Sequence, residues 1–344
     1  MPVRDSYRPG EVCWVDLSSR NRTTAAKFYG AVFGWAHDAL PSGGGPPYGF
    51  FARNGHSIGG LGELSPEMQA AGVPPTWNLY VRVDDVAATL DRAVALGGGV
   101  AVPCMDAMGA GWLGFLTDPD GATLALWQPS THQGAALRDE PGTLCWLELN
   151  TRDTARARAF YGPLFGWTFQ DMGVGGKPYT VLQVGNTGIG GMMQIQPEWG
   201  DVPAHWLPYF GAVDCDDTAA VVRASGGRVV TGPMDISPEH GRFVILADAQ
   251  GAVFACHQPA ASTVEQPAAD AAPEPAAAAA GSAPKPRKKS PTRTKAARRP
   301  ARKPARKPAK KAAKKAAKKA GKKAPKKAAR KPAKKKTTKS ARRK

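Results

Sequence analysis

The sequence predicts an α+β fold made of two tandem copies of one domain, followed by a basic tail. The first observation is an internal repeat, in which "AAKFYGAVFGW" at 25–35 returns as "RARAFYGPLFGW" at 156–167. The second is that each copy alternates between strand-like and helix-like periodicity. The third is a change of composition after Pro259, where bulky apolar residues give way to alanine, proline and lysine.

The repeat runs through the whole of both copies. Three further pairs of motifs match: "CWVDL" at 13–17 with "CWLEL" at 145–149, "SIGG" at 57–60 with "GIGG" at 188–191, and "DPDGATLALWQP" at 118–129 with "DAQGAVFACHQP" at 248–259. The offset between partners drifts by only a few residues, so loops differ in length while the order of elements is kept. We therefore expect one domain over 8–131 and a second over 139–260.

Each element of the first copy has a local signal. "EVCWVDL" alternates as a strand, and Asn21 can cap a helix that Gly34 ends. "YGFFARN" and "SIGGLGEL" read as short strands bounded by turn residues. The apolar face of the helix has the spacing of one side of an α-helix and comprises Ala25, Phe28, Tyr29, Val32 and Phe33.

The second half of the first copy repeats this order. "WNLYVRV" is a clean strand, and Asp84 or Asp85 can cap a helix that follows it. "WLGFLTDPDG" and "ATLALWQP" close the domain as strands joined by an Asp-Gly turn. The helix is expected to bury Val86, Leu90, Ala93 and Val94. The second copy runs in parallel, with Pro163 expected to shorten or kink the end of its first helix.

Charge divides the chain into two unlike parts. Of 47 Lys and Arg residues, 31 lie in 281–344, where there is no Asp or Glu, so the first 280 residues carry 16 basic against 28 acidic residues. The body is therefore mildly acidic and the tail strongly cationic. Five cysteines without a CxxC spacing, the lack of an apolar signal core and the lack of a long apolar run favour a reduced, cytoplasmic protein that does not span a membrane.

The order strand, helix and three strands, found twice per copy with "FYG…FGW" and "DPDG", resembles the vicinal oxygen chelate superfamily. This superfamily includes glyoxalase I, bleomycin-resistance proteins and extradiol dioxygenases. The resemblance covers about 8–260 and implies two βαβββ modules per domain, curled into a half-open barrel around a cleft. It also implies, for enzymatic members, a divalent metal held by a His on the first strand, a His or Gln on the fifth and a Glu on the last.

Carried over by position, the metal-binding pattern is absent from both copies. The three positions hold, in the first copy and then the second, Trp14, Asn78, Ala125, Trp146, Leu207 and Ala255. Indole offers only an N–H, and Leu and Ala offer no donor atom. We therefore expect no metal site of the family type and no cofactor. A divalent metal at a different site, formed by His205, Glu239 and His240 with Glu148, stays open as an alternative.

Alternate side chains of a strand share a face, so the family positions also predict what lines each cleft. The candidate ligand-binding residues are Trp14, Asp16, Asn78, Tyr80, Trp127, Trp146, Glu148, Tyr209 and His257. This aromatic lining with a few polar groups suits a small organic ligand. Asp16 and Glu148 are the candidate catalytic bases, because an acid beside indoles in a dry cleft has a raised pKa. The alternative is that both acids only bond neighbouring groups and that the tryptophans only pack.

Two smaller features complete the expectations for the body. Cys13 and Cys145 should point away from the acids, as small core residues. The glycines of "SIGG" and "GIGG" should mark bends in a curved sheet.

The chain beyond the repeats is expected to be a disordered linker over 261–284 and a disordered polybasic tail over 285–344. The tail is similar in composition to the C-terminal tails of linker histones, and it contains no aromatic residue or base-reading element. We expect non-specific nucleic-acid binding, with RNA, polyphosphate or an anionic membrane surface as alternatives. The residues expected to contact phosphates are Lys288, Lys289, Arg298, Arg299, Lys310, Lys311, Lys314, Lys315, Lys318, Lys319, Lys322, Lys323, Lys326, Lys327, Lys334, Lys335 and Lys336.

The sequence leaves three hypotheses for function. The first is a body that binds a small organic molecule without a metal, tethered to the nucleoid by its tail. The second is an enzyme of lyase, isomerase or oxygenase type that uses Asp16, Glu148 or an unrecognised metal. The third is an architectural nucleoid protein whose body is inert.

Overall fold

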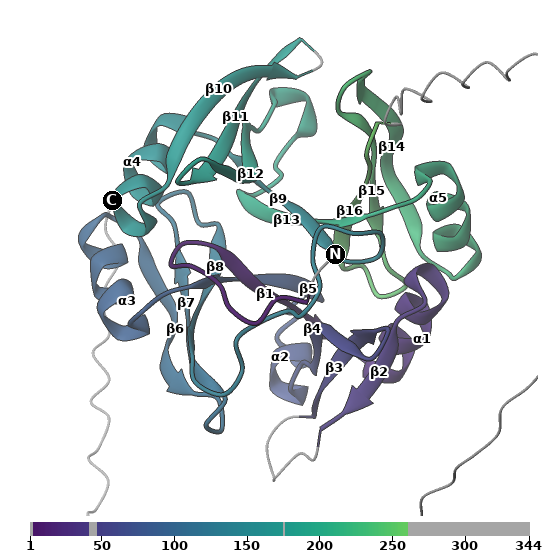
Figure 1. Cartoon of the computed structure of the whole chain (residues 1–344), viewed down its shortest axis with the longest axis horizontal. Coiled ribbons are helices and arrows are strands. Elements are labelled where there is room, and N and C mark those ends of the chain that lie inside the picture. The colour runs from purple at the N-terminus through teal and green to yellow at the C-terminus, as the bar shows by residue number, and fades with distance from the viewer. Residues whose placement is uncertain (1–2, 41–46, 175, 261–344) are drawn as a thin grey trace, which may run out of the picture. The chain divides into compact units, whose positions relative to one another are not determined.

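The structure is a computed structural model that describes residues 3–40, 47–174 and 176–260 (Figure 1). The linker expected over 261–284 and the tail expected over 285–344 lie outside the described residues. Within the described ranges, no helix is long and apolar enough to cross a membrane. All five cysteines are free.

The first copy folds around one eight-stranded sheet, in the order β2-β3-β4-β1-β5-β8-β7-β6. Its strands are β1 (Val12–Ser19), β2 (Ala36–Ala39), β3 (Tyr48–Arg53), β4 (His56–Glu63), β5 (Thr76–Arg82), β6 (Gly99–Asp106), β7 (Gly111–Thr117) and β8 (Thr123–Pro129). Its helices are α1 (Arg22–Phe33), α2 (Pro66–Ala70) and α3 (Val86–Ala95). β1 and β5 pair antiparallel at the middle of the sheet and join two βαβββ modules.

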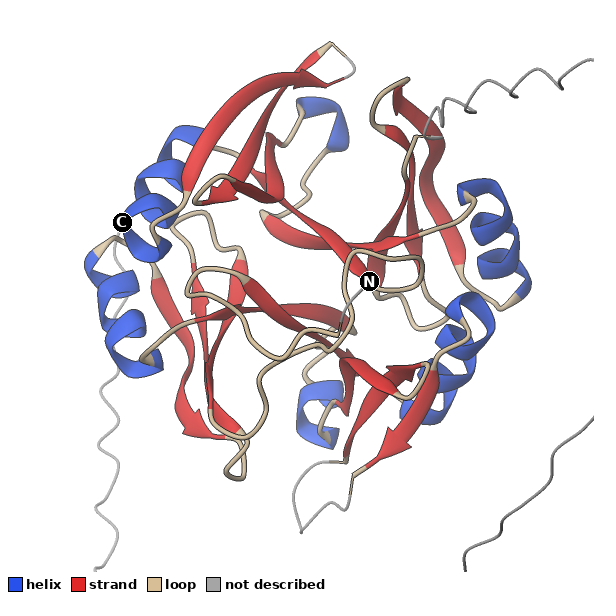
Figure 2. Cartoon of the chain, viewed as in Figure 1, coloured by secondary structure: helices blue, strands red, loops and turns tan. Residues whose placement is uncertain are grey.

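The second copy repeats this topology, in the order β10-β11-β12-β9-β13-β16-β15-β14. Its strands are β9 (Leu144–Thr151), β10 (Thr168–Val174), β11 (Lys177–Val184), β12 (Thr187–Gln194), β13 (His205–Gly211), β14 (Arg228–Ser237), β15 (Gly241–Ala247) and β16 (Val253–Gln258). Its helices are α4 (Thr154–Phe165), α5 (Cys215–Ala224) and the short 3-10 helix η1 (Pro197–Trp199). The predicted α+β fold of two tandem domains, each with a curled half-barrel sheet, is confirmed (Figure 2).

The predicted helix ends are largely confirmed. The side chain of Asn21 accepts from the backbone N–H of Thr24 at the start of α1, and Gly34 ends the helix in the left-handed conformation. Asp85 is the cap of α3. One expectation was wrong: Val94 is 51% exposed, and Thr89 is buried on α3 instead.

Pro163 does not shorten α4, which has the same 12 residues as α1 and also ends at a left-handed glycine, Gly166. The proline lies three residues before that glycine, in the last turn of the helix. The first helix therefore has the same length in both repeats.

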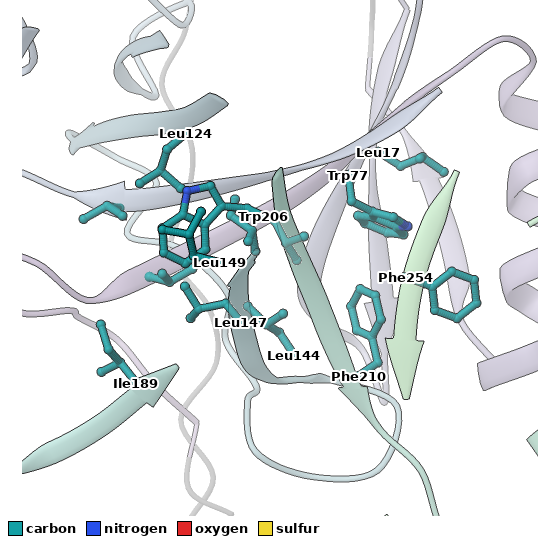
Figure 3. Packing of buried hydrophobic residues seen from close by; sticks show 14 of the residues in the cluster. Leu17, Trp77, Leu124, Leu144, Leu147, Leu149, Ile189, Trp206, Phe210 and Phe254 are labelled. Carbon is teal, nitrogen blue, oxygen red and sulfur yellow. The ribbon is translucent and has the colours of Figure 1, made fainter. Parts of the chain in front are cut away.

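The two domains share one hydrophobic core. α1 lies beside α5 and α3 beside α4, so each helix pair combines one helix from each domain (Figure 1). Figure 3 shows Trp77 of the first domain close to Phe210 of the second, and their ring centroids are 5.1 Å apart. The core therefore holds the repeats together as one body, while the concave faces of the sheets carry separate clusters of side chains.

Two matching hydrogen-bond chains cross between the domains inside this core. In one, the indole N–H of Trp77 donates to the Tyr29 hydroxyl at 3.0 Å, and that hydroxyl donates to Asp248 at 3.2 Å. In the other, Trp206 donates to Tyr161, which donates to Asp118. The tyrosine of each "FYG" thus bonds the aspartate that opens "DPDG" or "DAQG" in the opposite repeat, which explains why these motifs occur together.

Candidate functional site

Asp16, the first predicted acid, is buried on the concave face of the first sheet, on its central strand β1. Asn78 Nδ2 donates to its Oδ1 at 2.8 Å. The hydroxyls of Tyr80 and Tyr48 donate to its Oδ2 at 2.9 and 3.1 Å. Burial raises the pKa of the Asp16 carboxyl, and these three donors oppose that rise. The structure therefore brings Asp16, Asn78 and Tyr80 together as the sequence predicts.

Glu148 is the equivalent acid on β9 and is equally buried. Its Oε2 accepts from the Tyr179 hydroxyl at 3.1 Å, and the Tyr209 hydroxyl is a further partner. Its Oε1 accepts from Asn150 Nδ2 at 3.2 Å. Burial raises the pKa of Glu148, and the hydrogen bonds oppose the rise. The position opposite Glu148 on β13 holds Leu207, which cannot donate a hydrogen bond. The amide that donates to the acid is therefore Asn150 on β9 in this domain, whereas it is Asn78 on β5 in the first domain.

Each of these two hydrogen-bond networks also includes a tryptophan from the same strand as the acid. The indole N–H of Trp14 donates to the Tyr48 hydroxyl at 3.2 Å, and that of Trp146 donates to the Tyr179 hydroxyl at 3.0 Å. Burial and the neighbouring carboxylate raise the pKa of both tyrosines well above the ordinary value, so both remain protonated donors. Each acid is thus held by a tryptophan–tyrosine relay from its own sheet.

The glycines of the two "IGG" motifs make these relays possible. A side chain at Gly60 would collide with the Tyr48 hydroxyl, and one at Gly191 with the Tyr179 hydroxyl. Each glycine lies directly opposite the acid, on the neighbouring parallel strand. Besides any bend, the motif therefore leaves the space through which a tyrosine reaches the carboxylate.

His132, on the segment after β8, covers part of the concave face of the first domain, where Tyr7 and Ala135 also pack. The His132 ring lies edge-on to Trp14 at 4.5 Å between centroids and stacks on Phe50 at 5.5 Å. The backbone carbonyl of His132 also accepts from the Trp127 indole at 2.9 Å. Trp14 and Trp127 are only 4% and 5% exposed. In this domain the predicted tryptophans act as packing.

On the concave face of the second domain, the tryptophan of the central strand is less covered by the described residues, and the counterpart of His132 falls outside them. Trp146 is partly exposed, whereas Trp14 is buried. Phe243 and Ile245 of β15 are partly exposed, like Leu113 and Phe115 of β7, and Tyr209 is buried. His257 takes the place of Trp127 and lies towards the rim, with its Nε2 bonded to the backbone carbonyl of His240 at 2.7 Å. Around the buried Glu148, the described residues leave Trp146, Phe243 and Ile245 partly exposed.

Cys13 and Cys145 depart from the prediction. The strand register shifts at Cys13 on β1 and beside Tyr209 opposite Cys145, and each shift turns the cysteine towards the concave side. Cys13 packs with Trp14, and Cys145 packs with the cluster around Tyr209. Burial raises the pKa of both thiols to about 12, so neither is a reactive thiolate.

The alternative metal site is not assembled. His205 Nδ1 lies 2.8 Å from the Pro203 carbonyl, and His240 Nδ1 lies 2.8 Å from the Ser237 hydroxyl. Within residues 3–40, 47–174 and 176–260, no three His, Cys, Asp or Glu side chains gather in a way that suits a metal. The alternative set of His205, Glu239 and His240 with Glu148 is therefore not gathered into one cluster among the described residues.

A family model, the Glyoxalase/Bleomycin resistance protein/Dioxygenase superfamily, matches residues 14–126 and again 143–255. The chain belongs to this superfamily. Each match covers most of one domain: the first runs from Trp14 in β1 into β8, and the second from Thr143, just before β9, into β16. The resemblance inferred from the repeats is confirmed for both copies.

Relatives within the superfamily match the body over its full length. CFP32 of Mycobacterium tuberculosis, provisionally named as a glyoxylase, is 43% identical over 262 residues, which are 76% of this chain and 99% of CFP32. The anthracycline biosynthesis protein DnrV of Streptomyces peucetius is 30% identical over 259 residues, covering 72% of this chain and 93% of DnrV. About a quarter of this chain therefore has no counterpart in either match.

Solved structures of superfamily enzymes share the fold. The Mn(II)-bound glyoxalase from Novosphingobium aromaticivorans gives a TM-score of 0.51 at 14% identity, over 73% of this chain and 82% of that one. The 2,2',3-trihydroxybiphenyl 1,2-dioxygenase from Sphingomonas wittichii strain RW1 gives 0.52 at 14% identity, over 75% and 94%. At this identity the likeness concerns the fold alone.

The side chains at the superfamily's metal positions do not fit a metal. Both indoles donate their only N–H to tyrosine hydroxyls, and Asn78 Nδ2 is bonded to Asp16 and to Ser18. The last strands carry Ala125 and Ala255, which have no donor atom. Three nitrogen or oxygen ligands with an open position, as a catalytic metal requires, cannot be assembled from these side chains.

Four residues of the site were missed by the sequence analysis: Tyr48, Tyr179, His132 and Asn150. The two tyrosines had a signal, since "PY" at 47–48 returns at 178–179 with the same offset of 131 as the "IGG" glycines. His132 follows the last strand of its domain, where no periodicity indicates direction. Asn150 lies two positions beyond Glu148 and shares its face, but it falls just outside the matched motif "CWLEL".

Proposed function

We propose that the body binds a small, planar organic molecule on the concave face of the second domain, without a metal of the superfamily type. The observation that carries this proposal is the contrast in cover. Trp146 is partly exposed above the buried carboxylate, whereas its equivalent Trp14 is buried against His132. The flanking residues do not differ in this way, since Phe243 and Ile245 in the second domain and Leu113 and Phe115 in the first are all partly exposed. An apolar, aromatic surface with few polar groups favours an organic ligand.

The chemistry of a relative supports the ligand class. DnrV is named for anthracycline biosynthesis, and its match covers both domains. Anthracyclines are planar polycyclic aromatics, which suit an exposed indole and phenyl ring. In this proposal Trp146 and Phe243 contact the rings of the ligand, and Glu148 anchors a polar group.

The test compares two equivalent tryptophans in the full-length chain. Calorimetric titration with 2-naphthol should show binding to the wild type and to Trp14→Phe, and at least about tenfold weaker binding to Trp146→Ala, because stacking contacts with the ligand are lost. Equal affinity of all three proteins, or no binding to the wild type, would reject the concave face of the second domain as the site. Mass spectrometry of small molecules that copurify with the chain would then identify the natural ligand class.

The metal-free part of the proposal has its own measurement. Elemental analysis of the purified full-length chain should find less than one tenth of an equivalent of Mn, Fe, Ni or Zn per chain, on the order expected for adventitious ions. One equivalent of any of these metals, removed by a chelator together with 2-naphthol binding, would contradict it.

We propose that the tail adds non-specific DNA binding and nucleoid association to this body. The support is its charge, since 281–344 carry 31 Lys and Arg and no Asp or Glu. Neutralising phosphates releases counterions, so the logarithm of the affinity should fall by about 0.9 per phosphate contact for each tenfold rise in salt. Without aromatic residues or a base-reading element, the tail would bind different DNA sequences equally.

Gel-shift titrations of the full-length chain against a chain ending at 262 test this directly. A chain ending at 262 keeps both domains, whose last strand β16 ends at Gln258, and lacks all of 281–344. The full-length chain should shift random duplex DNA at low salt and lose that affinity steeply as salt rises, while the shorter chain should not shift it. Equal shifts by both would assign DNA binding to the body instead.

Proton transfer by Glu148 is a second candidate function. The observation that favours it is a buried carboxylate whose pKa is raised by desolvation and which lies beside an accessible surface. Deuterium exchange into the acidic C–H positions of a panel of small cyclic ketones, followed by NMR, should then be faster with the wild type than with Glu148→Gln. Equal exchange rates would leave binding as the function of the site.

A further inference from the structure

One buried hydrogen-bond acceptor on the concave face of the second domain has no donor among the described residues. Asn150 is 3% exposed, and its Nδ2 donates to Glu148 Oε1 at 3.2 Å. Its Oδ1 is buried, and among the described residues no protein donor reaches it. A flipped amide would place Oδ1 against the carboxylate oxygen, so the bond to Glu148 fixes which end of the amide is free.

The first domain has no such free acceptor at the equivalent place. Ser18 takes the position of Asn150 there, and its hydroxyl accepts from Asn78 Nδ2 at 3.1 Å. The same amide also donates to Asp16. A buried acceptor without a partner costs about 1–3 kcal/mol. Among the described acceptors of the two acid networks, Asn150 Oδ1 is the one in that state.

The groups around Asn150 are acceptors as well. The protons of Tyr179 and Tyr209 are committed to Glu148. His205 lies directly opposite Asn150 on β13, and its Nδ1 must carry the proton because it faces the carbonyl of Pro203. In neutral imidazole the remaining nitrogen then accepts. A ligand group that only accepts hydrogen bonds would therefore find few free donors at this end of the face.

The neighbours of Asn150 leave a route to its oxygen. Met193 on β12 and His205 on β13 lie at the same register on its two sides, and both are partly exposed. Methionine is flexible and repacks at low cost. A ligand seated on Trp146 can therefore place a polar substituent at Asn150 after small side-chain movements on the two neighbouring strands.

We propose that Asn150 is a specificity-determining residue whose Oδ1 accepts from a hydroxyl or N–H of a neutral ligand, so that the site selects hydrogen-bond donors. The inference rests on the proposed function and narrows it to neutral molecules that carry a hydroxyl or an amide-like N–H. Anionic ligands are disfavoured, because a carboxylate or phosphate would meet Glu148 and acceptor atoms without a positive charge to balance it.

A matched series of bicyclic arenes tests the inference on the full-length chain by calorimetry. The wild type should bind 2-naphthol about fivefold more tightly than 2-methoxynaphthalene, which keeps the rings and loses the donor. It should bind 2-naphthoate more weakly than either. Asn150→Leu should remove the preference between the first two while leaving the affinity for 2-methoxynaphthalene unchanged. Asn78→Leu, which alters the amide of the first domain, should keep the preference.

Several outcomes would overturn the inference. Equal affinity of the wild type for 2-naphthol and 2-methoxynaphthalene, or a preference that survives Asn150→Leu, would show that Oδ1 does not read the ligand. So would a crystal structure with 2-naphthol in which a buried water keeps Oδ1 satisfied. If the wild type bound none of the arenes, the proposed function would fail and this inference with it, whereas binding without a preference would remove the inference alone.

If Asn150→Leu does not fold, Asn150→Ser replaces it. Serine is the residue that the first domain carries at this position, and its shorter side chain cannot extend to the place of the amide oxygen. The preference for 2-naphthol should again fall towards unity. Thermal unfolding of each variant would confirm that the folded protein is compared.

Discussion

In the first domain Asp16 receives side-chain donors from three residues, and the aromatic surface above it is covered by His132. In the second, Glu148 has the same tyrosine relay, but Trp146 is partly exposed and the amide of Asn150 keeps a free acceptor. The carboxylate alone is therefore no sign of an active face, since both domains have it. Each acid has three side-chain donors, so what differs is the cover of the tryptophan above the acid and the partner of the amide beside it.

The domains are alike where they meet each other. Each contributes an "FYG" helix whose tyrosine reaches across to an aspartate of the other repeat, and both sheets pack on one core. Because each domain supports the other symmetrically, sequence changes on one concave face need not alter the fold. This arrangement allows the cover of Trp14 and of Trp146 to differ without a change of fold.

The largest expected effect comes from removing the two equivalent tryptophans. Trp14→Ala should cost about 3–5 kcal/mol of unfolding free energy, because Trp14 is buried against Phe50 and His132. Trp146→Ala should cost roughly 1–2 kcal/mol, because part of its ring already faces water. Urea unfolding of the full-length chain measures both values. Equal costs would mean that the two faces are packed alike, which would break the comparison.

The next effect tests the symmetric part of the molecule. Tyr29→Phe and Tyr161→Phe each leave an aspartate oxygen and an indole N–H without their shared partner, at a cost of about 1–3 kcal/mol. The two costs should agree within about 0.5 kcal/mol, since the chains of hydrogen bonds are equivalent. A clear difference in thermal unfolding between the variants would show that one domain depends on the shared core more than the other.

A smaller effect would convert one face into the other. His132→Ala removes the ring that lies on Trp14 and Phe50, at a cost of about 1 kcal/mol. If His132 is what closes the first domain, 2-naphthol binding should rise from one to two sites per chain, as measured by calorimetry. Gln133→Ala, at an exposed position on the same segment, should keep one site. An unchanged stoichiometry in the His132 variant would mean that other side chains close this face.

The fold could be predicted from the sequence because its signals are local or repeated. Strand alternation, the caps Asn21 and Asp85 and the glycine after each first helix follow from short stretches, and the duplication confirms each stretch independently. The residues that line the site could be predicted only where side chains alternate regularly between the two faces of a strand. A register shift turned Cys13 to the concave side, and no sequence pattern marks such a bulge.

The difference between the domains depends on tertiary contacts that the sequence does not show. His132 lies in an irregular segment whose path depends on backbone bonds to Ala110, far from it in the chain. The free oxygen of Asn150 follows from the exchange of Asn78 for Leu207 on the opposing strand. Such properties belong to pairs of residues across strands, and single positions in a sequence do not indicate them.

The smallest expected effect concerns pH and the two acids. Burial raises the pKa of Glu148 in the folded chain, so its contribution to stability is complete below the pKa of the unfolded chain and is lost as pH rises through the folded value. Glu148→Gln removes this loss, so the melting temperature of the variant relative to the wild type should increase between pH 4 and pH 8. Asp16→Asn should change in the same direction, because burial also raises the pKa of Asp16. A constant difference across this range would mean that the carboxylate has the same proton affinity in the folded and unfolded chain, and it would remove the basis for proton transfer by Glu148.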